Sequence, residues 1–302
     1  MTIRTAGFAA KSVVLSVDWE KDSSVWRCRS TEEDYGGIMM ATRPLLSLLR
    51  TKGIRASFLV ECHAAYAEHH MPGLFPELIQ EAAESSHEVG MHIHWAKRNG
   101  TGWTYPVHDA PWIATLVQHG RNSLATLGVQ SPPFRGGAFL RVPGLARILK
   151  QNGITIDSSL FRGLGHEWPV PRIDRVRTVL TYFSAVPEPY FCSDHDIRSP
   201  GASGVTEFPV SFNLTSLLRH KALRWRFLRQ LRDPKSRFCV LYFHIHELTL
   251  PDSGSNDKAQ LDIRTIEEIS DLLHFLKGSA HLSFSTFDEA SLRFREELSH
   301  GA

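Results

Sequence analysis

The chain has 302 residues, of which 22% are charged and 42% hydrophobic, and its formal net charge is +2. This length is sufficient for one large α/β domain or two small ones. The balanced charge argues against a general nucleic-acid binder, and no stretch approaches the roughly 20 apolar residues of a membrane span.

The first predicted strand ends in carboxylates. Residues 12–17 form the β-branched apolar run SVVLSV, which stops abruptly at Asp18, Trp19 and Glu20. A buried parallel strand has this pattern when it delivers side chains to a site at its carboxyl end. Because side chains alternate along a strand, Asp18 and Glu20 are expected on the same face.

A second strand is predicted to end in imidazoles. An amphipathic segment over 43–50, a strand over 53–60 and a helix over 75–85 precede the stretch HEVGMHIHW at 87–95. Strand alternation points His92 and His94 to the same side, so both rings could reach one metal ion. The competing interpretation is that these are polar residues at the start of a loop.

A third apolar run, FCVLYF at 238–243, is followed by His244, Ile245, His246 and Glu247. Titratable groups at the ends of buried strands cost desolvation energy unless they are paired or bound to a metal. Three such strands therefore predict a common site. Strands that alternate with helical segments favour a parallel sheet or barrel.

Taken in chain order, the stretches at the predicted strand ends and several short motifs elsewhere resemble those of the polysaccharide deacetylase family with the NodB homology domain, carbohydrate esterase family 4. The resemblance rests on HEVGMH at 87–92, PFRGG at 133–137, IDSS at 156–159, Phe243-His244 and STFDEA at 285–290. It implies a single catalytic domain over 1–302, folded as a distorted α/β barrel of about seven strands with its site at the carboxyl ends.

The implied activity is metal-dependent removal of an N-acetyl or other N-acyl group from an amino sugar, in a polysaccharide or its precursor in the bacterial cell envelope. The resemblance assigns Glu20, His92 and His94 to the metal and Asp18 to the role of base. Zinc is the first expectation, with cobalt, manganese or nickel as alternatives. Hydrolysis of an amide also needs an acid that protonates the departing amine.

Two positions depart from the family pattern. The family commonly has two adjacent aspartates, whereas here Trp19 stands second, so Asp18 to Glu20 resembles a variant whose carboxylates are separated by one residue. The family's second histidine usually lies four residues after the first, where this chain has Ala96, and His94 is the nearest substitute. These departures leave open a non-catalytic carbohydrate-binding barrel that has lost its metal. A deacylase or deformylase of a small N-acyl compound is the alternative among enzymes.

The remaining catalytic roles also come from the resemblance. Arg135 resembles the arginine that pairs with the catalytic aspartate, although a surface arginine would fit the sequence equally well. His244 resembles the general acid, and Asp157 resembles the carboxylate that keeps its imidazole protonated. Asp157 could instead belong to a helix cap or turn. Secondary candidates are His246 and Glu247.

Two further segments suggest binding surfaces. A loop with Trp95, Trp103, Tyr105 and Trp112 predicts either the wall of a glycan cleft or ordinary packing. Residues 217–237 carry eight basic side chains, while apolar residues recur at helical spacing at Leu218, Ala222, Trp225, Leu228 and Leu231. This predicts a basic amphipathic helix, either packed on the barrel or in peripheral contact with an anionic membrane or a lipid-linked sugar.

Cysteine usage and the N-terminal sequence bear on the compartment. Cys28, Cys62, Cys192 and Cys239 are widely spaced, which favours reduced core thiols over disulfides. Residues 1–11 contain no apolar segment typical of a signal peptide. The sequence therefore predicts a cytoplasmic protein with a carbohydrate substrate and no nucleic-acid partner.

Overall fold

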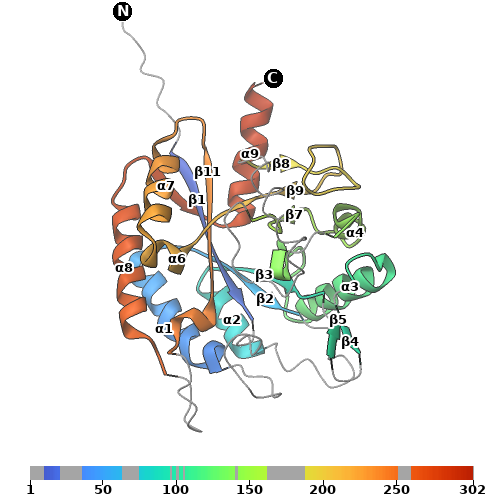
Figure 1. The fold of residues 1–302 in the computed structure, drawn as a ribbon, viewed down its shortest axis with the longest axis horizontal. Coiled ribbons are helices and arrows are strands. Elements are labelled where there is room, and N and C mark those ends of the chain that lie inside the picture. Colours follow the sequence, from blue (N-terminus) through green and yellow to red (C-terminus); the bar gives the residue numbers. More distant parts are fainter. Residues whose placement is uncertain are drawn as a thin grey trace, which may run out of the picture.

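The computed structural model describes residues 10–20, 36–62, 75–95, 97–99, 102–104, 106–139, 142–161, 188–250 and 260–301. Cys28, Ala96 and Tyr105 lie outside these ranges, and only the backbone of Trp103 is described. The described residues form a curled, mostly parallel sheet with helices on its outside (Figure 1).

The main sheet contains ten strands in the order β10-β11-β1-β2-β3-β6-β7-β9-β8, with β12 also paired to β1. All pairs are parallel except β8 with β9. The strands are β1 (Lys11–Trp19), β2 (Ser57–Glu61), β3 (Glu88–Ile93), β6 (Phe134–Gly136), β7 (Ile156–Asp157), β8 (Tyr190–Phe191), β9 (Thr206–Glu207), β10 (Val210–Asn213), β11 (Phe238–His244) and β12 (Leu282–Ser285). A separate hairpin pairs β4 (Lys97–Asn99) with β5 (Gly102–Thr104).

One interrupted strand brings the two ends of this sheet together. Only Phe208 and Pro209 separate β9 from β10. The Phe208 N–H donates to Asp157 O and the Val210 N–H donates to Leu160 O, both at 2.7 Å, so this stretch leaves β7 and then joins β11. With β9 and β10 counted as one strand, the ring has the seven positions expected for the distorted barrel, and β8 and β12 are short additions.

Both faces of β1 are covered, which explains its continuous apolar sequence. Every residue of β1 is buried. Val13, Leu15 and Val17 join the core beneath the outer helices, whereas Val14 joins a second cluster inside the barrel. Trp19 belongs to the outer core, where its ring lies edge-on to Phe58 at 5.7 Å. Asp18, on the opposite face from Trp19, therefore points into the barrel.

The helices cover the outside of the sheet. Figure 1 shows α1, α7 and α8 to the left of β1 and β11, with α3 and α4 to the right. The helices are α1 (Gly36–Lys52), α2 (Pro76–Glu84), α3 (Ala110–Thr126), α4 (Leu145–Gln151), α6 (Leu214–Arg219), α7 (Lys221–Arg232), α8 (Ile263–Lys277) and α9 (Phe287–Gly301), with short 3-10 turns η2 (Gly137–Phe139) and η3 (Ile245–Leu248). Two of them, α1 and α2, occupy the regions predicted from residues 43–50 and 75–85.

None of the helices described has both the length and the apolar character needed to cross a bilayer. The thiols of Cys62, Cys192 and Cys239 are free and buried, as the sequence predicts.

The prediction of one basic helix across 217–237 is wrong in its bounds and in its buried face. The chain breaks at His220, with φ −120° and ψ 107°, and α7 ends at Arg232. Within α7, Phe227 faces inward and contacts Phe212 at 5.4 Å. Trp225, expected on the packed face, is instead 62% exposed.

Candidate active site

The carboxyl ends of four strands place the predicted residues side by side. In the β1–β11 pair Asp18 lies opposite His244, and in the β3–β6 pair His92 lies opposite Arg135. Glu20 and His94 are the residues just beyond the ends of β1 and β3. Parallel strands end at the same edge of a sheet, and this common edge brings the three sequence motifs together.

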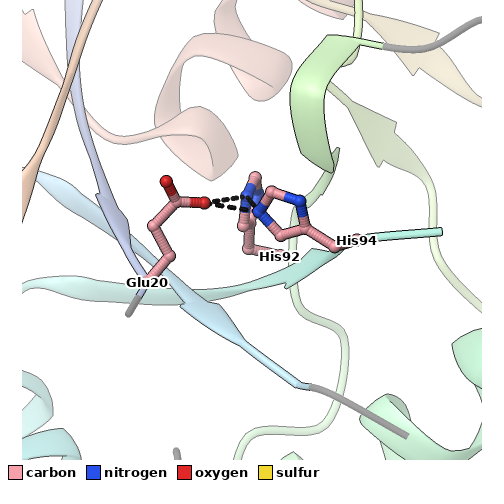
Figure 2. A group of neighbouring side chains, drawn as sticks. All are labelled: Glu20, His92 and His94. Carbon is pink, nitrogen blue, oxygen red and sulfur yellow. Dashed lines mark hydrogen bonds and ion pairs between the residues drawn. The ribbon is translucent and has the colours of Figure 1, made fainter. Parts of the chain in front are cut away.

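Glu20, His92 and His94 form a compact cluster (Figure 2). Glu20 Oε2 lies 3.0 Å from His92 Nε2 and 2.5 Å from His94 Nε2, and the two imidazole nitrogens are 3.2 Å apart. Burial alone would raise the pKa of Glu20. The imidazoles of His244, His94 and His92 outweigh this effect and hold the pKa well below its usual range, so the carboxylate is ionised.

The cluster has the chemistry and the space that a divalent metal requires. One ligand atom from each residue lies within 4.8 Å of the others, and two imidazoles with one carboxylate are a known zinc donor set. The absence of a side chain at Gly137 makes room for His94, because a Cβ there would lie 2.6 Å from His94 Cγ. The predicted convergence of these three side chains is confirmed.

Asp18 is paired with a buried arginine. Arg135 Nη1 donates to Asp18 Oδ1 at 2.5 Å, and its Nη2 donates to Ser16 Oγ at 2.9 Å. Arg135 Nε donates to Ser158 O at 3.0 Å. Arg135 is 0% exposed and Asp18 is 1% exposed, so the alternative of a surface arginine is wrong. These bonds fix the orientation of the aspartate.

His244 is oriented by Glu247, a residue that the sequence offered only as a secondary candidate. His244 Nδ1 lies 2.6 Å from Glu247 Oε1, while its Nε2 points toward Glu20 Oε1 at 3.5 Å. Burial opposes protonation of this ring. The charges of Glu20 and Glu247 outweigh burial and raise the pKa of His244 to about 10. Glu247 itself accepts hydrogen bonds from Thr215 Oγ1 and Asn213 Nδ2.

Asp157 lies elsewhere in the hydrogen-bond network. Its described contacts are with Ser159, whose hydroxyl donates to Oδ1, and with the carboxyl group of Glu207 opposite it on β9. The expected pairing of Asp157 with His244 is therefore wrong, since Glu247 occupies His244 Nδ1. In the ring, the combined β9/β10 strand separates β7 from β11, which carries His244, and Asp157 lies opposite Glu207 of β9.

Asp157 and Glu207 form a fully buried pair of acids. Both residues are 0% exposed, and Asp157 Oδ2 and Glu207 Oε2 each accept no hydrogen bond from any N–H or O–H of the described residues. Burial raises the pKa of Asp157 to about 6, and burial together with the charge of Asp157 raises that of Glu207 well above its usual value. The two carboxyl groups are hydrogen-bonded to each other, which requires that one of them carries a proton.

The other candidates have mixed outcomes. His246 lies in η3, beyond the end of β11, and its ring stacks on that of His244 with centroids 5.1 Å apart. Trp95 is 0% exposed and packs near Phe134 in the core, so it cannot stack on a sugar. Trp112 is partly buried against the same core.

Comparison with known proteins supports the fold. No family model and no curated protein matches the sequence. A structure from Mycobacterium smegmatis, assigned as a polysaccharide deacetylase, is 14% identical with a TM-score of 0.63 over 97% of this chain and 92% of that one. A polysaccharide deacetylase assigned in Pseudomonas aeruginosa PAO1 is 10% identical with a TM-score of 0.56 over 96% and 93% of the two chains. The chain has the polysaccharide-deacetylase fold.

The polysaccharide-deacetylase fold also occurs as part of larger enzymes. The 4-alpha-glucanotransferase of Thermococcus litoralis is 11% identical with a TM-score of 0.55, and the similarity covers 93% of this chain but only 40% of that one. The fold is therefore shared with a protein named for a different reaction. Function has to be argued from the side chains of the site.

Proposed function

We propose that this protein hydrolyses the N-acyl group of an amino sugar, in a glycan or glycan precursor, with the help of a divalent metal. The proposal rests chiefly on the cluster of Glu20, His92 and His94, whose ligand atoms lie within 4.8 Å of one another. The fold shared with polysaccharide deacetylases supports a glycan as substrate.

Glu20, His92 and His94 would hold the metal, and we expect zinc because of this donor set. When bound, a divalent metal supplies a Lewis acid for the amide carbonyl and lowers the pKa of water. Asp18 accepts the proton of the attacking water. Arg135 keeps Asp18 oriented through the 2.5 Å ion pair.

His244 then donates a proton to the departing amine nitrogen, so the C–N bond breaks to give a carboxylic acid and a free amine. Its raised pKa keeps the ring charged at neutral pH, ready to act as an acid. Glu247 holds Nδ1 and leaves Nε2 directed toward the cluster. This acid lies opposite Asp18 in the β1–β11 pair, so acid and base come from adjacent strands.

Cleavage of an amide fits these groups better than cleavage of a glycosidic bond. A glycosidase uses two carboxyl groups, one of them protonated, on either side of the scissile bond. Here Asp18 is paired with Arg135, and Glu20 lies between imidazoles. Asp157 and Glu207 have the raised pKa of a general acid but are fully buried, out of reach of a sugar.

The decisive experiment is metal analysis of wild type and His92→Ala, with release of free amine from N-acetylated amino-sugar oligomers as the activity. We expect near-stoichiometric metal and activity in wild type. His92→Ala should lose both while keeping its melting temperature in the metal-free state, because so large a core does not depend on one ion.

The matched control is His195→Ala, which removes an exposed histidine that contacts Arg147. This variant should retain metal and activity. Wild-type metal affinity in His92→Ala would rule out the proposed ligand set, and a metal-loaded wild type that releases no amine from any N-acyl amino sugar would rule out the function.

A further inference from the structure

The outward face of α7 combines an exposed tryptophan with basic side chains. Trp225 is 62% exposed and lies on the side of the helix opposite the buried Phe227. Successive residues of an α-helix are 100° apart, which places Lys221, Arg229 and Arg232 on the same face as Trp225. Arg226 adds a further exposed cation beside them. We call Lys221, Trp225, Arg226, Arg229 and Arg232 the α7 patch.

Packing among the described residues does not account for the α7 patch. The inward side of α7 is formed by Phe227, with Leu223, Leu228 and Leu231 partly buried against the core. Arg224 also has an internal role, since it donates to Leu217 O and Leu218 O at the end of α6. In contrast, no ion pair within the described part of the chain engages the four cations of the patch. Arg229 lies over the Trp225 ring at 5.6 Å.

The charge of the patch is local. Helix α7 contains no acidic residue, although the whole chain carries a net charge of only +2. Asp233 directly follows the end of α7, and Glu268 and Asp271 of α8 line the groove between α7 and α8. A concentrated positive field on an otherwise balanced protein favours one anionic partner surface over general binding to polyanions.

We propose that the α7 patch docks this protein on the surface of an anionic phospholipid bilayer. Lysine and arginine side chains near such a surface are attracted to its headgroups, and tryptophan is favoured at the interface because one end of its ring system is apolar and the other polar. A lone exposed tryptophan surrounded by cations has both features. The docking is peripheral, because only one helical face takes part.

The orientation of α7 has a consequence for the bound protein. This helix connects α6, which follows the carboxyl end of β10, to the amino end of β11, and it packs on β10 through Phe227 and Phe212 on the outside of the sheet (Figure 1). Lys11 at the amino end of β1 donates to Gln230 O and Leu231 O near the end of α7. A helix lying flat on a membrane would therefore orient the strands roughly parallel to the surface, so that the site opens along the membrane.

The test is co-sedimentation of the full chain with phosphatidylcholine vesicles and with vesicles that also contain phosphatidylglycerol. We expect binding only to the anionic vesicles, and weaker binding as salt is raised. Trp225→Ala should weaken binding about tenfold or more. The triple variant Arg226→Gln, Arg229→Gln and Arg232→Gln should weaken it on the order of a hundredfold, since each basic residue at an anionic surface contributes about fivefold.

Matched controls test whether losing any exposed apolar or basic side chain, rather than one in the α7 patch, weakens vesicle binding. Leu292→Ala removes an apolar side chain that is 64% exposed on α9, and Arg264→Gln removes a cation that is 87% exposed on α8. Both should bind vesicles like wild type. His92→Ala should also bind normally, so that failure of the proposed activity and failure of membrane docking are distinguishable. All changed side chains of the patch are exposed, and unchanged melting temperatures would verify folding.

Three results would overturn the proposal. One is an absence of binding to anionic vesicles at low salt, and another is equal binding by wild type and the triple variant. The third is stronger binding to a DNA oligonucleotide than to vesicles, lost in the same triple variant, which would assign the patch to nucleic acid.

Discussion

The proposed role of Asp18 as the base, held in place by Arg135, predicts the effect of replacing its carboxylate by an amide. Asp18→Asn keeps the shape of the side chain but cannot accept a proton from water. We expect this variant to retain metal while kcat falls on the order of a hundredfold or more. Metal content and steady-state kinetics on the same preparation measure both effects. Loss of metal in Asp18→Asn would identify Asp18 as a ligand instead.

The contact between His244 and Glu247 predicts a shift in the pH profile. His244 acts in its charged form, so activity should decline as pH rises through its pKa. Glu247 raises that pKa, and Glu247→Gln removes the negative charge. The alkaline limb of kcat/KM should therefore move to lower pH in Glu247→Gln, with metal content unchanged.

Asp157→Asn is the control for this experiment, because Asp157 is bonded to Ser159 rather than to His244. Its alkaline limb should stay in place. A limb that shifts in Asp157→Asn but not in Glu247→Gln would restore the pairing expected from the sequence.

Some residues of the site could be predicted from the sequence, whereas the positions of Glu247 and Glu207 could not. Strand alternation predicted that His92 and His94 share one side and that Asp18 and Glu20 share a face, and the family resemblance then grouped Glu20 with the two histidines. Glu247 follows the end of β11 in a 3-10 turn, where alternation no longer predicts direction. Glu207 stands in a two-residue strand before Phe208 and Pro209, and no local pattern marked it.

At the scale of elements, η2 supports the cluster through a missing side chain. Because a Cβ on Gly137 would come within 2.6 Å of the His94 ring, Gly137→Ala should displace His94. We expect metal affinity to fall about tenfold or more, as for other changes that disturb ligand orientation. Competition with a chromophoric chelator measures this affinity.

Gly278→Ala is the matched control, since the nearest atom to a Cβ there lies at 3.5 Å, an ordinary contact. It should bind metal like wild type. Unchanged affinity in Gly137→Ala would show that His94 is not required at its present position.

The pairing of β7 with β9 predicts how stability depends on pH. The pKa of Asp157 is raised to about 6 and that of Glu207 is raised well above its usual value, whereas unfolded carboxyl groups have values near 4. The folded protein thus binds protons that the unfolded chain releases. The resulting stabilisation is present at acidic pH and is lost as pH rises from about 4 through 6 and beyond.

In Glu207→Gln, the amide of the introduced glutamine donates a hydrogen bond to Asp157, and the titrating proton of the Glu207 carboxyl group is removed. The melting temperature of this variant relative to wild type should therefore increase with pH over that window. Glu296→Gln, at an exposed position on α9, should show no such trend. If the difference in melting temperature between Glu207→Gln and wild type stays constant with pH, Asp157 and Glu207 do not share a proton.

At the scale of the whole molecule, the barrel and its site edge could be predicted because long apolar strands and helices alternate along the chain. The closure of the ring could not be predicted from the sequence. It depends on residues 206–213, where Pro209 lacks the N–H that a continuous ladder needs, so this stretch does not have the pattern of a strand. The outward position of Trp225 also escaped prediction: Trp225 lies about 200° around the helix from Phe227, and it is Phe227 that is buried.

The position of β1 between β11 and β2 has a consequence for biosynthesis. Its neighbour β11 comes from far along the chain: the Ser16 hydroxyl donates to Leu241 O, and these residues are 225 positions apart in sequence. During translation β1 can pair with β2 early, but its other edge has no native partner until β11 emerges from the ribosome. Nascent chains that lack β11 should therefore expose an apolar strand edge, which is a target for chaperones and a route to aggregation.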